Sequence, residues 1–259
     1  MNCSITSIFY SPIKSLSFEN LRMCKIKKKI GILNDRSFAF TRNIDLETAK
    51  LIEKFPDKRN INNFLSLKNS PILNKYSFNL QKNKLTLSKN NKELYSIFAD
   101  KYDQHFLMCD KLLDLENTLS KKIFFLNNKL HPFYDTTNSG NVLNSISLIN
   151  LSSISDFEKK VDKKIEFERF RGNFYVSNID PWVERTWINK IIRINNTSFK
   201  VEKHIPRCSA TNLKPTTDNV TINLPLTLKK HYNHIDMGVY LIPLENGEIN
   251  IGDQVILDG

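Results

Sequence analysis

The segment FKVEKHIPRCSAT, residues 199–211, decides how the second half of this sequence folds. Apolar and polar residues alternate from Phe199 to Ile205, which is the pattern of a β-strand with one buried face. Pro206 cannot donate a hydrogen bond to a neighbouring strand, so we expect the strand to end there. Cys208 would then stand at a strand-to-loop edge, where a side chain can face a cleft.

The thiol of Cys208 is the most informative of four cysteines. A thiolate is a nucleophile and a soft metal ligand, and a neighbouring guanidinium such as that of Arg207 favours this form. The alternative is that Cys208 is a small buried hydrophobe, and the local sequence leaves both open. Cys3, Cys24 and Cys109 lack such a neighbour, and we expect them to be buried. Four cysteines make no disulfide framework, so we expect a cytoplasmic protein with free thiols.

Short strands with a few helices extend outward from this segment in both directions. We predict strands at residues 5–10, 24–30, 36–42, 64–67, 76–80, 85–87, 172–176, 191–194, 199–205, 238–244 and 249–257. Residues 144–151 form an apolar run with Ser and Asn inserted. We predict helices at residues 45–54, 92–102, 111–119, 153–163 and 224–232, the first of them capped by Asp45. This order predicts a mixed, β-rich α+β fold.

The chain of 259 residues carries 38 Lys and Arg against 27 Asp and Glu, a formal charge of +11. Such an excess can indicate nucleic acid, phosphate ligands or an anionic membrane. Here the lysines are scattered among asparagines, which is typical of a solvated surface, so we expect no nucleic-acid partner. No stretch reaches the ~18 apolar residues of a membrane span, and Met1 to Leu16 has no secretory pattern.

Several familiar site motifs are missing from the sequence. It has no CxxC pair, so zinc is a poor fit, and we expect His231 and His234 to be surface residues. It has no GxGxxG, P-loop or GxSxG motif, and its seven glycines are few and scattered. An anionic ligand would therefore need cationic side chains.

Candidate cations stand at breaks in the predicted strand pattern. Lys14 follows a strand end, Arg36 follows Asn34-Asp35, and Arg171 enters a strand. Each of them alone could be an ordinary salt-bridge partner. Together with Arg207, they have the composition of an anion site assembled from both halves of the chain.

These residues resemble the MOSC family, the domain found at the C-terminus of molybdenum-cofactor sulfurases, and most of all its two-part members, the mitochondrial amidoxime-reducing enzymes and their bacterial counterparts. The resemblance rests on separate short motifs in the same order: YSPIKS (10–15), GILNDR (31–36), NSISLIN (144–150), FRGN (170–173), WVERTW (182–187), PRCSAT (206–211), DMGVY (236–240) and GEINIGD (247–253). It implies an N-terminal MOSC β-barrel-like domain, residues 1–125, and a C-terminal MOSC β-barrel with peripheral helices, residues 126–259.

The resemblance also implies site residues. Cys208 matches the family cysteine that ligates molybdenum in the amidoxime reducers and is thought to carry sulfur in the sulfurases, so it is the implied catalytic residue and metal ligand. The implied cofactor-binding residues are Lys14, Arg36, Asn144, Ser145, Arg171, Asn173 and Arg207. Asn144 replaces a threonine of the family pattern but is still a hydrogen-bonding residue. Pro206 replaces a small polar residue of the animal enzymes, and this change would alter one cofactor contact.

The resemblance implies a function as well. The chain would bind the molybdenum cofactor (Mo-molybdopterin) and act as an oxidoreductase that reduces N-hydroxylated small molecules. An external electron-transfer protein would deliver the electrons, because the sequence has no ferredoxin-type cysteine spacing. Two alternatives stay open: a sulfur carrier with a persulfide on Cys208, and a non-catalytic binder of anions or nucleic acid.

Overall fold

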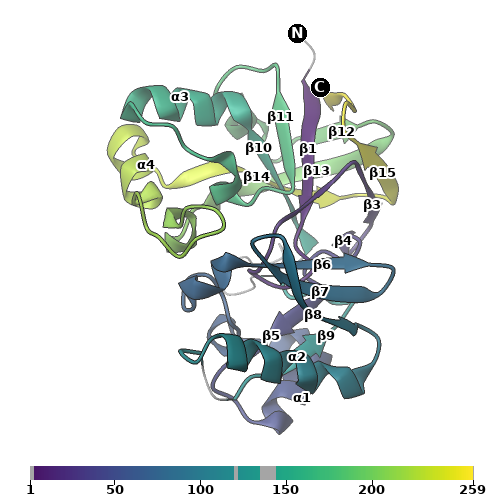
Figure 1. The fold of residues 1–259 in the computed structure, drawn as a ribbon. Helices are drawn as coiled ribbons and strands as arrows, with labels where there is room; N and C mark the ends of the chain where they lie inside the picture. Colours follow the sequence, from purple (N-terminus) through teal and green to yellow (C-terminus); the bar gives the residue numbers. More distant parts are fainter. Residues whose placement is uncertain (1–2, 120–121, 135–143, 259) are drawn as a thin grey trace.

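The computed structural model describes residues 3–119, 122–134 and 144–258, and its largest element is an eight-stranded sheet (Figure 1). The strand order is β16-β12-β13-β14-β10-β11-β1-β2. These strands are β1 (Ser4–Tyr10), β2 (Glu19–Leu21), β10 (Ile146–Asn150), β11 (Phe174–Ser177), β12 (Ile191–Ile194), β13 (Thr197–Pro206), β14 (Asp236–Pro243) and β16 (Val255–Leu257). The sheet therefore joins the beginning of the chain to its second half.

Three smaller sheets and a set of helices complete the fold. The sheets are β15-β3-β4 (Gly247–Asn250, Met23–Lys27, Gly31–Ile32), β5-β9 (Phe38–Phe40, Phe125–Asn127) and β6-β7-β8 (Tyr76–Gln81, Lys84–Lys89, Lys92–Phe98). The α-helices are α1 (Leu46–Lys54), α2 (Tyr102–Leu115), α3 (Leu151–Val161) and α4 (Leu224–Tyr232), and two short 3₁₀ helices, η5 (Phe167–Phe170) and η7 (Ser209–Asn212), flank the site described below. Figure 1 shows α3 and α4 beside the large sheet, and we call this part the upper body. It shows α1 and α2 with the sheets β5-β9 and β6-β7-β8 below, and we call this part the lower body.

Each body has its own hydrophobic core. Phe199 and Val201 of β13 point into the core of the large sheet, as the alternating sequence predicts. Phe38 and Phe78 belong to a separate cluster in the lower body. Because β1 pairs with β11 and β3 pairs with β15, strands from the first half also complete the upper body. The division into residues 1–125 and 126–259 stays a prediction.

The fold is mixed α+β and rich in strands, as predicted, but the barrel closure is not confirmed. Hydrogen-bonded pairing in the described residues runs from β16 to β2 and leaves the large sheet open. An isolated bridge between Ser4 and Gln254 brings β1 beside the segment that precedes β16. The sheet therefore curls strongly without forming a closed barrel.

Two predicted elements are wrong. The segment Lys92–Tyr102 begins as strand β8 rather than as a helix, because Asn90 and Asn91 take positive φ angles of 52° and 61° and return the chain along β7. Residues 64–67 form no strand beyond one bridge between Phe64 and Thr41. The predicted helix at 45–54 is confirmed, with the Asp45 carboxylate accepting from the Thr48 N–H at 2.7 Å.

The longest helix of the described ranges, α2, has 14 residues. No helix in that part of the chain has the length and apolar character needed to cross a membrane.

Candidate functional site

Cys208 lies where β13 gives way to η7, and it caps the start of that short helix. The Thr211 N–H and hydroxyl donate to the Cys208 carbonyl oxygen at 3.1 and 2.8 Å, which fixes the turn that presents the thiol. Cys208 is exposed, whereas Cys3, Cys24 and Cys109 are buried. The thiol that the sequence singles out is therefore the accessible one.

Arg207 is buried directly beside this thiol and is held by main-chain carbonyls. Its Nε and Nη2 donate to the Met237 carbonyl, the Nε at 3.0 Å, and its Nη1 donates to the Phe170 carbonyl at 2.7 Å. Burial lowers the pKa of Arg207, and the nearby Tyr240 and Cys208 act in the opposite direction. Arg207 thus supplies a positive charge of fixed position, with nitrogens committed to the backbone.

Arg171 joins the two halves of the molecule. It follows η5 in the left-handed conformation with φ 50°, and its Nη2 donates to the Ser17 carbonyl at 2.6 Å. The guanidinium carbon lies 5.1 Å from the centre of the Phe18 ring. Burial lowers the pKa of Arg171 to about 10, and the positive charge of Arg36 adds to this, while Cys208 opposes it. Arg171 therefore interacts electrostatically with both Arg36 and Cys208.

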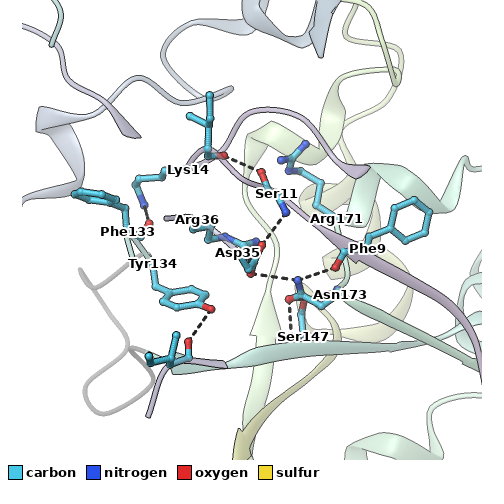
Figure 2. Close-up of polar contacts among 12 residues, drawn as sticks. Phe9, Ser11, Lys14, Asp35, Arg36, Phe133, Tyr134, Ser147, Arg171 and Asn173 are labelled. Atoms are coloured by element: carbon cyan, nitrogen blue, oxygen red, sulfur yellow. Dashed lines mark hydrogen bonds and ion pairs between the residues drawn. The ribbon is translucent and has the colours of Figure 1, made fainter. Parts of the chain in front are cut away.

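Arg36 pairs with the adjacent carboxylate of Asp35 at the centre of a polar network (Figure 2). The Asp35 side chain is 1% exposed and that of Arg36 is 19% exposed. Asp35 also accepts from the Ser11 N–H at 2.7 Å and from the Asn173 amide at 3.3 Å. Burial acts to lower the pKa of Arg36, but the charge and hydrogen bond of Asp35, together with Tyr134 and Tyr240, raise that pKa above its ordinary value. Arg36 therefore stays charged and partly open.

The Asn173 side chain ties this network to two strands, β1 and β10. Its Oδ1 accepts from the Ser147 N–H and hydroxyl at 3.1 and 2.8 Å. Its Nδ2 donates to the Phe9 carbonyl at 3.1 Å and to Asp35. These bonds use the two donors and two acceptor sites of an amide. In this structure Asn173 positions Asp35, and a direct contact of its side chain with a cofactor stays a prediction.

Lys14 approaches the network from the other side. Its buried Nζ donates to the Phe133 carbonyl at 3.2 Å and lies 5.6 Å from the centre of the Phe64 ring. The Phe133 N–H in turn donates to the Arg36 carbonyl at 2.7 Å. Figure 2 shows Lys14 and Arg36 beside Phe133 and Tyr134. Lys14 thus reaches the neighbourhood of Arg36 through Phe133.

Asn144 and Ser145 precede β10, the first half-buried and the second buried. The Asn144 carbonyl oxygen lies 3.3 Å from the position that a Cβ would take at Gly31, whose φ of 93° favours glycine. This contact puts Asn144 at the turn that leads to Asp35 and Arg36.

The arrangement brings Arg171 and Arg207 near the exposed thiol of Cys208, and Arg36 near Arg171. Sequence reasoning missed Asp35, together with Ser11 and Ser147, which hold the network in place. The available signal was the position of Asp35 directly before Arg36 in the quoted GILNDR motif. Chemically, the group combines a soft sulfur ligand with cations that can bind phosphate.

Histidine is not part of this group. His234 accepts a hydrogen bond from the Asp236 N–H at 3.2 Å and stacks edge-on with Trp182 at 5.6 Å. Across the described ranges, no three His, Cys, Asp or Glu side chains come together as a metal site would require.

Comparison with known proteins confirms the resemblance for the second half of the chain: residues 135–256 match the MOSC domain family model. Mitochondrial amidoxime reducing component 2 of Rattus norvegicus is 29% identical over 122 residues, 42% of this chain and 36% of that protein. Mitochondrial amidoxime-reducing component 1 of Homo sapiens is 26% identical over 124 residues, 43% of this chain and 36% of that protein. The match thus spans little more than a third of these relatives.

Two solved structures are also similar. The YuaD protein from Bacillus subtilis gives a TM-score of 0.47 at 11% identity, covering 99% of this chain and 96% of that chain. YiiM from Geobacillus stearothermophilus gives a TM-score of 0.36 at 15% identity, covering 44% of this chain and 54% of that chain. Both TM-scores lie below 0.5.

Proposed function

We propose, on the premise that residues 135–256 match the MOSC domain, that this protein binds the molybdenum cofactor and reduces N-hydroxylated compounds. The supporting observation is the positive charge around Cys208. Arg36 lies close enough for its charge to disfavour that of Arg171, and Asp35 is the carboxylate paired with Arg36. An anionic group bound beside them would relieve this repulsion.

The donor set fits a phosphate-bearing, sulfur-ligated cofactor. Lys14, Arg36 and Arg171 would hold its phosphate and pterin, with Asn144, Ser145 and Asn173 lining the approach, and the Cys208 sulfur would ligate the metal. When bound, the cofactor supplies two-electron redox chemistry. The reduction of an N–O bond is taken from the relatives, whose names identify them as amidoxime reducing components.

The chain's own residues prepare the site. Asp35 pairs with Arg36, and Asn173 donates a hydrogen bond to Asp35, so the charge of Arg36 has a fixed position. Arg207 is held by two carbonyls beside Cys208, so its positive charge needs no rearrangement when a ligand arrives. The substrate would be a small molecule, and we expect a separate electron-transfer protein to supply the electrons.

A sulfur carrier is the second candidate, and the exposure of Cys208 favours it. An accessible thiolate flanked by arginines can hold a persulfide, whose negative charge the same cations would stabilise. In that case no metal would be retained.

Metal analysis of the freshly purified protein, expressed in a host that makes the cofactor, tests the two candidates. We expect about one molybdenum and one pterin per chain, since the cofactor carries the chemistry. Native mass spectrometry that finds one additional sulfur on Cys208 and no molybdenum would favour the carrier. A chain with neither modification would reject both.

A matched pair of arginine variants tests the phosphate contact. Arg171→Gln should lower pterin content at least about tenfold, because it removes a charged donor at the site. Arg193→Gln, at an exposed position of β12, should leave the pterin content unchanged. Equal loading of the two variants would contradict the assignment of Arg171.

A further inference from the structure

A cavity of about 230 Å³ lies between the two bodies of the molecule, next to the site. Phe18, Leu67 and Tyr76 line it from the first half of the chain, and Glu168 and Leu213 line it from the second half. Arg171 also lines it, so the cavity and the arginine group around Cys208 share one wall. Of the residues given a role above, Arg171 is the one that lines this cavity.

The rim of the cavity is fixed by contacts between the halves. The Asn74 amide donates to the carbonyl oxygens of Lys214 and Thr217 at 2.9 and 2.6 Å. Lys75 and Asp218 form an ion pair at 2.8 Å. A cavity held in this way is formed before a ligand arrives, as small-molecule sites usually are.

Several hydrogen-bond donors in the cavity wall are engaged. Arg169 donates through its three nitrogens to Glu166, Asn212 and Thr221. The Nδ2 of Asn74 is used at the rim, as described above. Arg171 donates to the Ser17 carbonyl and lies against the Phe18 ring.

Acceptors in the wall are more open. Glu168 is half-buried, and its carboxylate has no hydrogen bond or ion pair among the described residues. Glu19, also half-buried, accepts from the Asn79 amide at 2.9 Å through one of its two oxygens. A carboxylate that lines a cavity without a protein partner can accept from a ligand that donates hydrogen bonds. The cavity therefore suits a ligand that donates hydrogen bonds and carries positive charge.

The remaining wall is apolar. The Phe18 ring stacks on Phe9 with centroids 4.7 Å apart, which holds it rigid. Leu67 and Leu213 are 4% exposed each, and Tyr76 is also buried. This surface can cover a flat or aliphatic body while the charged end of the same molecule meets Glu168.

We propose that this cavity binds a small organic cation, with its ammonium or amidinium end on Glu168 and its apolar body against Phe18 and Leu213. The volume is below that of a typical drug-sized site, so the ligand is about the size of a single ring with a short chain. The inference does not depend on the molybdenum cofactor.

Isothermal titration calorimetry on the full chain tests this with three probes of one shape: benzylamine, benzyl alcohol and benzoate. Benzylamine should bind at least about tenfold more tightly than the other two at neutral pH, because it alone carries a cation to Glu168. Glu168→Gln should remove this preference, and Glu47→Gln, on the exposed face of α1, should keep it.

Three results would overturn the proposal: no binding of benzylamine, equal affinity for benzyl alcohol, or binding that Glu168→Gln leaves unchanged. Tighter binding of benzoate would show that Arg171 governs the cavity instead of Glu168. The comparison of probes on the wild-type chain stands even where a variant fails to fold. Because binding is measured without reference to metal content, failure here is distinct from failure of the cofactor assignment.

Discussion

Cys208 and Cys109 place the same side chain in opposite surroundings. Cys109 is buried on the inner face of α2, and burial raises the pKa of its thiol to about 12. Cys24 in β3 is buried in the other core with a pKa also near 12. Cys208 is exposed, and two arginine charges, those of Arg171 and Arg207, act on it.

The difference follows from the elements that carry these thiols. A helix face or a strand interior turns a cysteine into the core, where it behaves as a small hydrophobe. A strand that ends at a proline, followed by one tight turn, leaves Cys208 at the edge of the sheet. Reactivity therefore depends on where the element stops and on which charges surround that point.

The steepest contrast should appear in thiol alkylation. In the native chain at pH 8, iodoacetamide should label Cys208 about a thousandfold faster than Cys24 or Cys109, because a buried thiol with a pKa near 12 forms almost no thiolate. Peptide mass spectrometry over time gives the rates. In concentrated urea the differences should vanish, and native labelling of Cys109 as fast as Cys208 would contradict the structure.

The buried carboxylate of Asp35 pairs with Arg36, so removing this carboxylate should lower the free energy of unfolding. Asp35→Asn leaves Arg36 without its partner and should lower the free energy of unfolding by about 3 kcal/mol, measured by urea denaturation. Asp258→Asn, whose pair with Arg193 is 3.9 Å apart and well exposed, should cost at most about 0.5 kcal/mol. Equal losses for the two variants would argue against a special role for Asp35.

Replacing the unreactive Cys109 should lower the free energy of unfolding more than replacing the reactive Cys208. Cys109→Ser puts a hydroxyl into a closed core and should lower the free energy of unfolding by about 1–2 kcal/mol. Cys208→Ser replaces an exposed group and should change it by less than about 0.5 kcal/mol. Thermal or urea unfolding checks both, and a large loss for Cys208→Ser would mean that its thiol is packed.

The smallest expected effect concerns the pH dependence of stability at Glu184. This buried acid is hydrogen-bonded to neutral side chains, whereas Asp35 pairs with an arginine. Its carboxylate accepts from Asn150 and Ser153 at 3.0 and 2.8 Å, and burial raises its pKa above the ordinary 4.5. The folded chain therefore holds this proton at pH values where the unfolded chain has lost it. Stability should fall as pH rises from 4.5 through the raised pKa.

Urea denaturation across that pH range measures the slope. Glu184→Gln removes the titrating group and should flatten this part of the profile. A profile with the same slope in the wild-type chain and the variant would show that other groups are responsible.

Much of the fold follows from local pattern. The alternation before Pro206, the Asp45 cap and the apolar run that becomes β10 each specify an element within a few residues. The strand at Lys92–Phe98 could not be predicted from local pattern, since its apolar positions also suit a helix. Its strand is decided by pairing with β7, where Leu85 opposes Ile97. Such pairing depends on tertiary contacts and overrides local preference.

The site is less accessible to sequence reasoning. The Pro206 break indicates an edge position for Cys208, and the isolated arginines indicate an anion site. The contact of Asp35 with Asn173 joins residues 138 positions apart, and no local pattern reports it. The closed amide network of Asn173 likewise appears only once β1 and β10 are assembled around it.

Molybdenum content in two cysteine variants, purified side by side from a cofactor-producing host, tests the role of Cys208 most directly. Cys208→Ser should bring bound molybdenum down to background, while Cys109→Ser should keep about the wild-type amount per folded chain, because a buried thiol cannot reach a ligand. Retention of wild-type molybdenum by Cys208→Ser would contradict the assignment of the exposed sulfur as the metal ligand.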